Sequence, residues 1–316
     1  MRIAVLDDYQ GVALTLADWS KIAKGHDIVV FRHPLGGLET TAAALADFDV
    51  VAIMRERTPF LRPLLERLTK LRLLVTTGLR NDSIDLVCAL ERGVVVCGTT
   101  SPGYATAELT FALILALARN LHREAESMRS GGWQVGLGSD LRGKTLGIVG
   151  LGRLGGEVAG FARAFGMRIV AWSQNLTAET AAGKGAERVG KADLFKQADF
   201  ITVHIKLSDR SRGLVGPAEI AAMKPTAYLV NTSRSAIVDR VALVQALQSG
   251  AIAGAALDVY DEEPLPADHA LRRVPNLLPT PHIGYVTRET YRAFYTGTVE
   301  AIEAWMAGTP VYVLKP

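Results

Sequence analysis

The sequence predicts an α/β protein with two doubly wound parallel sheets, and three observations lead to this fold class. Short apolar runs alternate with segments of helical periodicity, a pattern typical of parallel sheets covered by helices on both faces. One of these units carries a glycine-rich turn between a strand and a helix. At 316 residues, 49% of them hydrophobic, the chain is long enough for two domains with sizeable cores.

Composition narrows the function classes. A formal net charge of +3 without long basic runs gives no footprint for nucleic acid. The longest apolar stretch, residues 109–118, is too short to span a membrane, and MRIAVLDDYQ lacks a signal-peptide pattern, so we expect a cytoplasmic protein. Cys88 and Cys97 have no CxxC spacing and are expected to be free thiols. The six histidines are scattered, so no metal site is predicted.

The first hundred residues are expected to form one parallel sheet. Its strands are predicted at 1–7, 27–32, 50–54, 71–77 and 94–97, and its helices at 14–24, 41–48, 63–69 and 84–92. A long helix, 107–123, follows; it is apolar nearly all round and therefore buried, within the domain or between subunits. A last helix at 289–307 and a strand-like 311–313 can return to the first domain. The boundaries predicted are 1–98 with 284–316 for one domain and 99–283 for the other.

The second domain is organised around KTLGIVGLGRLGGEVAGFARAFGMRIVAWSQN, residues 144–175. An apolar strand, 145–149, leads into the turn Gly150-Leu151-Gly152-Arg153-Leu154-Gly155, a helix runs to 165, and a second strand covers 168–172. This strand, turn, helix and strand context is what a dinucleotide-binding fingerprint requires. Gly150 allows the tight turn, Gly152 lets the backbone approach a pyrophosphate, and Gly155 lets the helix pack on the strand. Further strands are expected at 200–205, 227–231, 254–259 and 277–279, with helices at 193–197, 217–223 and 240–249.

The choice between NAD and NADP is left open by the end of the second strand. NAD sites usually place an acid there for the ribose 2′-hydroxyl, but this chain has Ser173, Gln174 and Asn175. No Arg or Lys stands there either; the nearest downstream are Lys184 and Arg188. The lack of an acid favours NADP slightly.

Three polar residues follow predicted strands of this domain: Arg234 in NTSRS, Glu263 in DVYDEEP and His282 in PTPHIG. Ligands of doubly wound sheets bind at the carboxyl ends of the strands. Arg suits a carboxylate, which its planar fork binds through two oxygens. His suits proton transfer near neutral pH, and a carboxylate beside it orients the ring and favours its charged form. A single strand-end Arg or Glu is more often a solvated loop residue; the combination with a nucleotide turn favours a catalytic set.

These motifs resemble the D-isomer-specific 2-hydroxyacid dehydrogenase family, and the resemblance covers nearly the whole chain: LRGKTLGIVGLGRLG, Ala107-Glu108, the Trp133 loop, LVNTSR, ALDVYDEEPL and LLPTPHIG. It implies a flavodoxin-like substrate domain and a Rossmann domain with a cleft between them. It further implies that Arg234 anchors the substrate carboxylate, that His282 exchanges the proton and that Glu263 keeps the imidazole charged. The cofactor residues it implies are Gly150, Gly152, Arg153, Leu154, Gly155, Ser173, Gln174, Asn175, His204, Thr232, Ser233, Asp258, Gly284 and Thr106. The family also places a dimer interface around the helix beginning near Ala107.

The sequence departs from the family in the loop that helps to hold the substrate carboxylate. It has Gly78-Leu79-Arg80, with Arg80 where the family has a second glycine. Two interpretations are open: Arg80 binds a second anionic group of the substrate, or it is a surface residue. Arg55, after another strand, would join the same basic patch. The substrate-binding residues predicted are therefore Arg55, Gly78, Leu79, Arg80 and Arg234.

The leading interpretation is a reductase of small 2-keto acids that uses NADH or NADPH and acts reversibly. Two alternatives share the fold. A phosphite-type dehydrogenase would retain the Arg, Glu and His set. A non-enzymatic NAD(H)-sensing regulator would need a peptide-binding surface and usually has disordered extensions. The sequence shows no such extension, so we expect the enzyme rather than the regulator.

Overall fold

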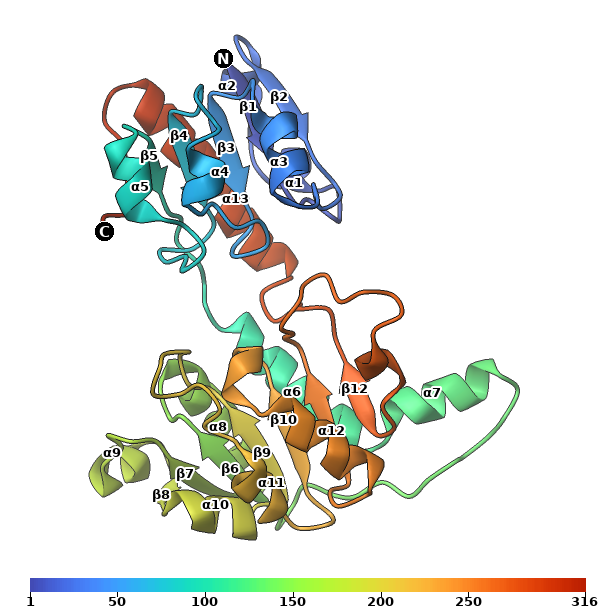
Figure 1. Cartoon of the computed structure of the whole chain (residues 1–316). Helices are drawn as coiled ribbons and strands as arrows, with labels where there is room; N and C mark the ends of the chain where they lie inside the picture. The colour runs from blue at the N-terminus through green and yellow to red at the C-terminus, as the bar shows by residue number, and fades with distance from the viewer. The chain divides into compact units, whose positions relative to one another are not determined.

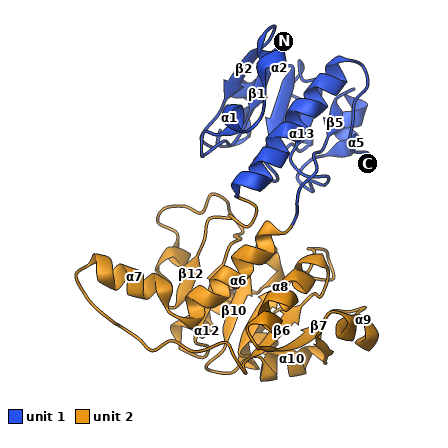
Figure 2. Ribbon diagram, turned by 180° about the vertical axis from the view of Figure 1, so that it is seen from behind, with its two compact units in different colours: residues 1–103, 287–316 blue, residues 104–286 orange.

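The computed structural model describes residues 1–316, which form two compact units. Unit 1 consists of Met1–Gly103 and Thr287–Pro316, and unit 2 of Tyr104–Val286 (Figure 2). The chain therefore passes between units after residues 103 and 286, rather than after 98 and 283. No helix combines the length and the apolar character that crossing a membrane requires.

Unit 1 is built on a five-stranded parallel sheet in the order β2-β1-β3-β4-β5 (Figure 1). One core cluster lies on one face of this sheet and includes Leu6, Ile53 and Leu74. On the other face, α13 packs against α1 and β4 and so joins the end of the chain to its beginning. The elements are β1 (Arg2–Val5), α1 (Ala13–Leu16), α2 (Ser20–Ala23), β2 (Asp27–Val30), α3 (Leu38–Leu45), β3 (Val50–Ile53), α4 (Arg62–Leu65), β4 (Leu73–Thr76), α5 (Leu86–Glu91), β5 (Val95–Cys97) and α13 (Arg288–Met306).

Unit 2 is built on a seven-stranded parallel sheet in the order β12-β11-β10-β9-β6-β7-β8. The strand order reverses between β6 and β9, and ligands of doubly wound sheets bind at such a switch point. Its elements are α6 (Ala105–Ala118), α7 (Leu121–Arg129), β6 (Thr145–Val149), α8 (Arg153–Ala164), β7 (Arg168–Trp172), α9 (Ala178–Gly183), β8 (Glu187–Arg188), α10 (Lys191–Gln197), β9 (Phe200–Val203), α11 (Pro217–Ala221), β10 (Tyr228–Asn231), the 3-10 helix η1 (Ser235–Ile237), α12 (Arg240–Gln248), β11 (Gly254–Leu257), η2 (Ala270–Arg273) and β12 (Leu277–Pro279).

Both faces of the unit 2 sheet are covered, which confirms the predicted fold class. Successive residues of one strand enter different cores: Leu229 packs into the cluster on one face and Val230 into the cluster on the other. This is why the strands read as continuous apolar runs, since strands buried on both faces have no polar side. The carboxyl ends of all seven strands consequently lie along one edge, where polar side chains gather.

Two predicted helices are broken in the structure. Residues 107–123 form α6 and α7 instead of one helix, because Asn120 adopts a left-handed conformation with φ of 53° between them. Asn tolerates this conformation better than other residues with a Cβ. Residues 14–24 form α1 and α2, since Ala17 is extended and ends α1.

Three further segments differ from expectation. Residues 311–313 form no strand; Val313 makes an isolated antiparallel bridge with Cys97. Neither α9 nor the two-residue β8 was predicted. Thr177 precedes α9 and caps it, because its side chain accepts a hydrogen bond from the N–H of Thr180.

Candidate functional site

In the glycine turn at the switch point, close contacts leave no room for a side chain at two of the three glycines. Gly150 has φ of +101°, and a Cβ there would lie 2.7 Å from the carbonyl oxygen of His204. A Cβ at Gly155 would overlap the carbonyl oxygen of Gly150, so α8 can approach β6 only without it. A Cβ at Gly152 would meet nothing within 4 Å, so this position faces open space. The backbone at Gly152 is therefore accessible to a bound group.

The α8 helix starts directly after Gly152, and the first N–H groups of a helix have no partners within it. Arg153 and Leu154 lie in this first turn, and such a helix end favours phosphate. Across the switch point, both ring nitrogens of His204 are buried without a hydrogen-bond partner. Burial lowers the pKa of His204 to about 4, so the ring is neutral at pH 7. The open glycine and the unsatisfied imidazole both fit a dinucleotide bound across this edge.

The segment after β10 is held by several hydrogen bonds. The Ser233 hydroxyl donates to the carbonyl of Val203 at 2.7 Å, and the Thr232 hydroxyl lies 2.8 Å from that of Thr110 on α6. The Asn231 amide donates to the carbonyl of Arg234 at 3.0 Å. Arg234 itself is extended and half-buried, and its Nη1 donates to the carbonyl of Ser233 at 2.8 Å. These bonds fix the direction in which the guanidinium leaves the strand.

Glu263 and His282 come from the two neighbouring strands and form a close pair. The Glu263 Oε2 lies 2.5 Å from the His282 Nδ1. The other carboxylate oxygen accepts the backbone N–H of Tyr260 at 2.8 Å, which orients the carboxylate. His282 has φ of 51°, an unusual conformation for a non-glycine residue. Such backbone conformations persist where the surrounding structure enforces them, often at functional sites.

Asp258, directly after β11, holds the backbone around His282 in this conformation. The carboxylate is fully buried and accepts the Thr280 hydroxyl at 2.7 Å and the backbone N–H groups of Ile283 and Gly284 at 2.8 Å each. Burial raises the pKa of Asp258, and the bond from the Thr280 hydroxyl works against that rise. All three donors flank His282, so Asp258 holds the loop that carries it. Thr106 completes the loop by donating its hydroxyl to the Gly284 carbonyl at 3.0 Å.

The strand order brings the three candidate catalytic residues to one edge. Arg234 follows β10, Glu263 follows β11 and His282 follows β12, and these three strands are adjacent and parallel. The glycine turn follows β6 at the same edge of the same sheet. A nucleotide turn, an oriented imidazole and a guanidinium thus share one sheet edge.

Comparison with known proteins agrees with this arrangement. Residues 111–284 match the family model "D-isomer specific 2-hydroxyacid dehydrogenase, NAD binding domain". The chain is 42% identical to a glyoxylate reductase of Aeropyrum pernix over 257 residues, 78% of this chain and 76% of that protein. The chain belongs to the D-isomer specific 2-hydroxyacid dehydrogenase family. It is accordingly an oxidoreductase of a family that acts on CH–OH donors with a nicotinamide dinucleotide.

Two further relatives show the range within this dehydrogenase family. A D-3-phosphoglycerate dehydrogenase of Methanocaldococcus jannaschii is 38% identical over 84% of this chain, which spans about half (51%) of that protein. A crystal structure of a putative D-3-phosphoglycerate dehydrogenase oxidoreductase from Ralstonia solanacearum superposes with a TM-score of 0.94 at 37% identity, covering 100% of this chain and 97% of that one.

In unit 1 of the dehydrogenase, the structure brings Arg55 and Gly78 together. Arg55 follows β3 with φ of 53°, and its Nη1 donates to the Thr77 carbonyl at 3.1 Å. A Cβ at Gly78 would overlap that Nη1, so the guanidinium lies directly on the glycine. Leu79 and Arg80 are exposed, and Arg80 makes no hydrogen bond or ion pair. Arg55 is held by the Thr77 carbonyl after β4 and by the Glu56 carboxylate at 3.4 Å, whereas Arg80 has no such partner.

Sequence reasoning assigned no role to two cations of unit 2 that contact the cofactor edge. Lys184 donates to the carbonyls of Leu151 and Gly152 in the glycine turn, and Arg188 donates to the carbonyl of Leu176 after β7. Their sequence separation from these partners hides the contacts. The contacts could have been predicted only with α9 and β8, which the sequence pattern did not show. Lys184 caps the end of α9 and contacts the glycine turn, and Arg188 lies in β8 and contacts the turn after β7.

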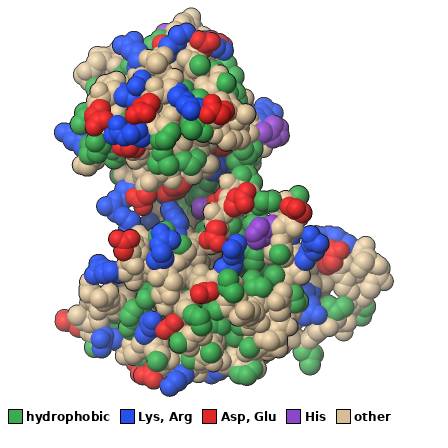
Figure 3. All heavy atoms as spheres, viewed as in Figure 1, with side chains coloured by type: hydrophobic (Ala, Val, Ile, Leu, Met, Phe, Trp, Pro, Cys, Tyr) green, Lys and Arg blue, Asp and Glu red, His purple; other side chains and the backbone are tan.

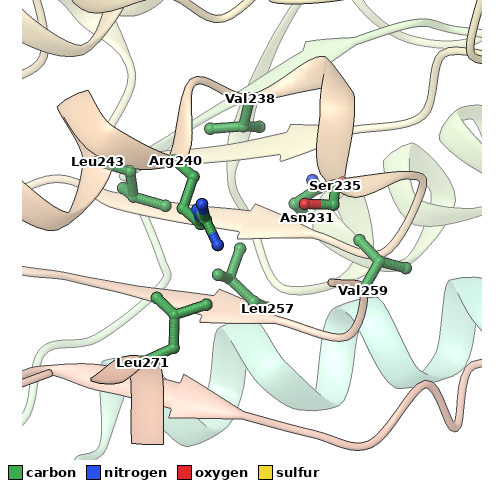
Figure 4. A pocket seen from close by; sticks show the side chains of 8 residues that line it. All are labelled: Asn231, Ser235, Val238, Arg240, Leu243, Leu257, Val259 and Leu271. Carbon is green, nitrogen blue, oxygen red and sulfur yellow. The ribbon is translucent and has the colours of Figure 1, made fainter. Parts of the chain in front are cut away.

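A small hollow lies between β10, β11 and α12 (Figure 4). Its volume of about 10 Å³ is near the minimum for one water molecule, so it is no substrate site. Arg240 borders it, and that side chain is paired with Asp261 at 3.4 Å. The lining residues are Asn231, Ser235, Val238, Arg240, Leu243, Leu257, Val259 and Leu271.

Acidic and basic side chains are intermixed on the face shown in Figure 3. The structure contains no cluster of three or more potential metal ligands.

Proposed function

We propose that this chain reduces a small 2-keto acid to a D-2-hydroxy acid, reversibly, with NADH or NADPH. The observation that carries the proposal is the close pair of His282 and Glu263 on the sheet edge that also bears Arg234 and the glycine turn. A bound nicotinamide supplies the hydride for C2 of the substrate. The protein must then provide a proton for the keto oxygen and an anchor for the carboxylate.

His282 is the proton donor in this proposal. The Nδ1–H of His282 donates its hydrogen bond to the Glu263 carboxylate. The other ring nitrogen, Nε2, is therefore the one that gives its proton to the keto oxygen. The carboxylate, itself held by the Tyr260 N–H, fixes the orientation of the imidazole. In the oxidative direction the same nitrogen takes the proton from the hydroxyl. Asp258 is a positioning residue, since it acts through the backbone of the 280–284 loop.

Arg234 is the carboxylate anchor. A guanidinium offers two parallel N–H groups to the two oxygens of a carboxylate, which fixes the plane of the substrate. Hydrogen bonds to the backbone on both sides of Arg234 limit the freedom of this anchor. We further propose that Asp258, Gly284, Thr106, Thr232, Ser233 and His204 line the nicotinamide and pyrophosphate path, as the family resemblance implies.

For unit 1, we propose that Arg55 and the Gly78–Arg80 turn also bind substrate. The curated relatives include both glyoxylate reductases and phosphoglycerate dehydrogenases, whose names point to substrates without and with a phosphate group. Arg55 and Arg80 favour a substrate with a second anionic group. If Arg80→Ala leaves the KM of every tested 2-keto acid unchanged, Arg80 plays no part in substrate binding.

The experiment is a spectrophotometric assay of NADH and NADPH oxidation. Glyoxylate, hydroxypyruvate, oxaloacetate and phosphohydroxypyruvate are compared for the wild type and for His282→Asn. Asn accepts the left-handed backbone of this position but transfers no proton, so kcat should fall by about 10²–10⁴-fold. Arg234→Gln should lower kcat/KM by about 10²-fold, the size of a lost charge-assisted bidentate contact.

The matched control is His33→Asn, which changes an exposed histidine of unit 1 and should retain wild-type rates. Full activity of His282→Asn would contradict the assigned proton donor. Tight binding of the cofactor without turnover of any acid would contradict the reductase and favour the sensing regulator.

A further inference from the structure

The adenosine end of the proposed cofactor site has a distinctive charge pattern. Ser173 is half-buried and Gln174 and Asn175 are exposed, so the turn after β7 presents neutral polar groups. A carboxylate at this place binds the ribose hydroxyls of NAD and repels the 2′-phosphate of NADP. The structure lacks this repulsion. The preference between NAD and NADP then depends on whether positively charged side chains from other elements lie near this turn.

Lys184, at the end of α9, contacts the glycine turn that follows the neighbouring strand β6. Its Nζ donates to the Leu151 carbonyl at 2.9 Å and to the Gly152 carbonyl at 2.8 Å. Its side chain runs past Gly156, where an added Cβ would lie 3.4 Å from the Lys184 Cδ. An ammonium has three donors, so one remains for a further acceptor. The positive charge is thus fixed on the glycine turn itself.

Arg188 reaches the turn after β7 from β8. Its partner in the parallel register is Ala171 of β7, and its Nε donates to the Leu176 carbonyl at 2.7 Å. Leu176 closes the turn that starts at Ser173, whose carbonyl accepts the Leu176 N–H at 3.1 Å. The terminal nitrogens of Arg188 make no hydrogen bond to the protein and no ion pair. They remain available as a planar fork of the kind that binds phosphate.

No carboxylate neutralises these two cations. Neither forms an ion pair within 4 Å, and the nearest acid in sequence, Glu187, is paired with Arg168 at 2.6 Å. Lys184 therefore places an uncompensated positive charge on the glycine turn at the N-terminus of α8, and Arg188 places another at the turn after β7. A dianionic group is favoured there over a pair of hydroxyls.

We propose that Lys184 and Arg188 bind the 2′-phosphate of NADP(H), which makes this chain NADP(H)-preferring. The inference rests on the proposed dehydrogenase function and assigns these two side chains as its cofactor-specificity residues. The alternative is that both cations only tie loops together. In that case their removal would affect every adenine nucleotide equally.

The test measures the binding of 2′,5′-ADP and 5′-AMP to the full chain by isothermal titration calorimetry, without any turnover. The wild type should bind 2′,5′-ADP at least about tenfold more tightly, the effect of one charge-assisted hydrogen bond. Lys184→Met and Arg188→Met should each reduce the ratio of the two affinities by about tenfold. The ratio is the readout because distortion of the glycine turn would weaken both ligands together and leave it unchanged.

The matched control is Lys196→Met, an exposed lysine on α10 of the same unit, which should keep the wild-type ratio. Equal affinity of the wild type for the two nucleotides, or an unchanged ratio in both variants, would overturn the inference and leave an NAD-dependent dehydrogenase in place. Binding of neither nucleotide by the folded protein would refute the dehydrogenase proposal and this inference with it.

Discussion

Asp7, just after β1, is a buried carboxylate whose burial is unfavourable for the stability of the fold. It follows β1 in a left-handed conformation with φ of 58°, and its carboxylate is buried. The carboxylate accepts the Thr58 hydroxyl at 2.7 Å and the Tyr9 hydroxyl at 3.3 Å. Burial raises the pKa of Asp7, and the Thr58 bond and the charge of Arg57 offset part of this rise. The net result is a carboxyl group that is easier to bury protonated than charged.

The sign of the pH dependence follows. The ordinary pKa of the group is 3.8, and the folded value is higher, so the folded chain keeps a proton that the unfolded chain has lost. The contribution of Asp7 to the unfolding free energy therefore falls as the pH rises from 3.8 through the folded pKa. Asp7→Asn should raise the melting temperature at pH 7, with the difference closing toward pH 4.

Thermal melts between pH 4 and pH 8 check this expectation. Asp47→Asn is the control of opposite sign, because the hydrogen bond from Lys70 lowers the pKa of Asp47. That carboxylate stabilises the fold above its ordinary pKa of 3.8, and the contribution is lost as the pH falls further. A lower melting temperature of Asp7→Asn at pH 7 would contradict the account of Asp7.

At the residue scale, the sequence predicted the pairing of His282 with Glu263 because each follows an apolar strand of one sheet. It did not predict the part played by Asp258, whose three bonds to the 280–284 loop depend on how that loop folds back. Lys184 was out of reach for the same reason. Its two acceptors lie in the glycine turn, more than thirty positions earlier in the chain.

At the element scale, the approach of α8 to β6 rests on Gly155. An added methyl group there would overlap the Gly150 carbonyl, which is backbone and cannot turn aside. The same helix contains Gly160, where an added methyl group would meet nothing within 4 Å. The two glycines of one helix thus differ in a way that a pair of matched substitutions can measure.

Gly155→Ala should destabilise unit 2 by about 1–3 kcal/mol, the range for overpacking a close contact. Gly160→Ala should stabilise it by about 0.5–1 kcal/mol, because alanine favours the helix and removes unfolded-chain entropy. For a unit of this size, these changes shift the melting temperature by about 2–4 °C per kcal/mol. Calorimetric scans would show both. Equal effects of the two substitutions would refute the steric account.

The elements themselves were largely predicted, since apolar runs mark every strand of four or more residues. Failures occurred where the backbone, rather than the pattern of side chains, decides. Asn120 divides α6 from α7 by its left-handed backbone conformation, which the side-chain pattern did not indicate. The two-residue β8, with Glu187 and Arg188 both exposed, offers no apolar alternation to detect.

At the scale of the whole molecule, the segment from α7 to residue 139 is the part least integrated into its unit. No residue of α7 is buried, and Figure 1 shows the helix and the loop after it extending from the sheet. Apolar side chains are nevertheless concentrated here, with Leu137 98% and Trp133 70% exposed. Such a group of exposed apolar residues marks an interaction surface. The family resemblance implies a dimer through the helix beginning near Ala107, and we predict that a second copy of the chain also covers this segment.

Sedimentation at micromolar concentration should then show a dimer, and Trp133→Glu combined with Leu137→Glu should shift it to a monomer, since buried charge opposes the contact. Val241→Glu, an exposed apolar position on α12, is the control and should stay dimeric. A monomeric wild type at every concentration would rule out the proposed dimer.

The return of α13 to unit 1 affects the order in which the two units fold during translation. Unit 2 is encoded without interruption between residues 104 and 286, whereas unit 1 needs α13 against α1 and β4. During translation, unit 2 can therefore mature on the ribosome while the earlier half waits, still missing its final helix. Protease treatment of chains stalled at residue 316, with α13 still inside the exit tunnel, should leave residues 104–286 resistant and residues 1–103 cleaved. The first sequence made would be the last to become native.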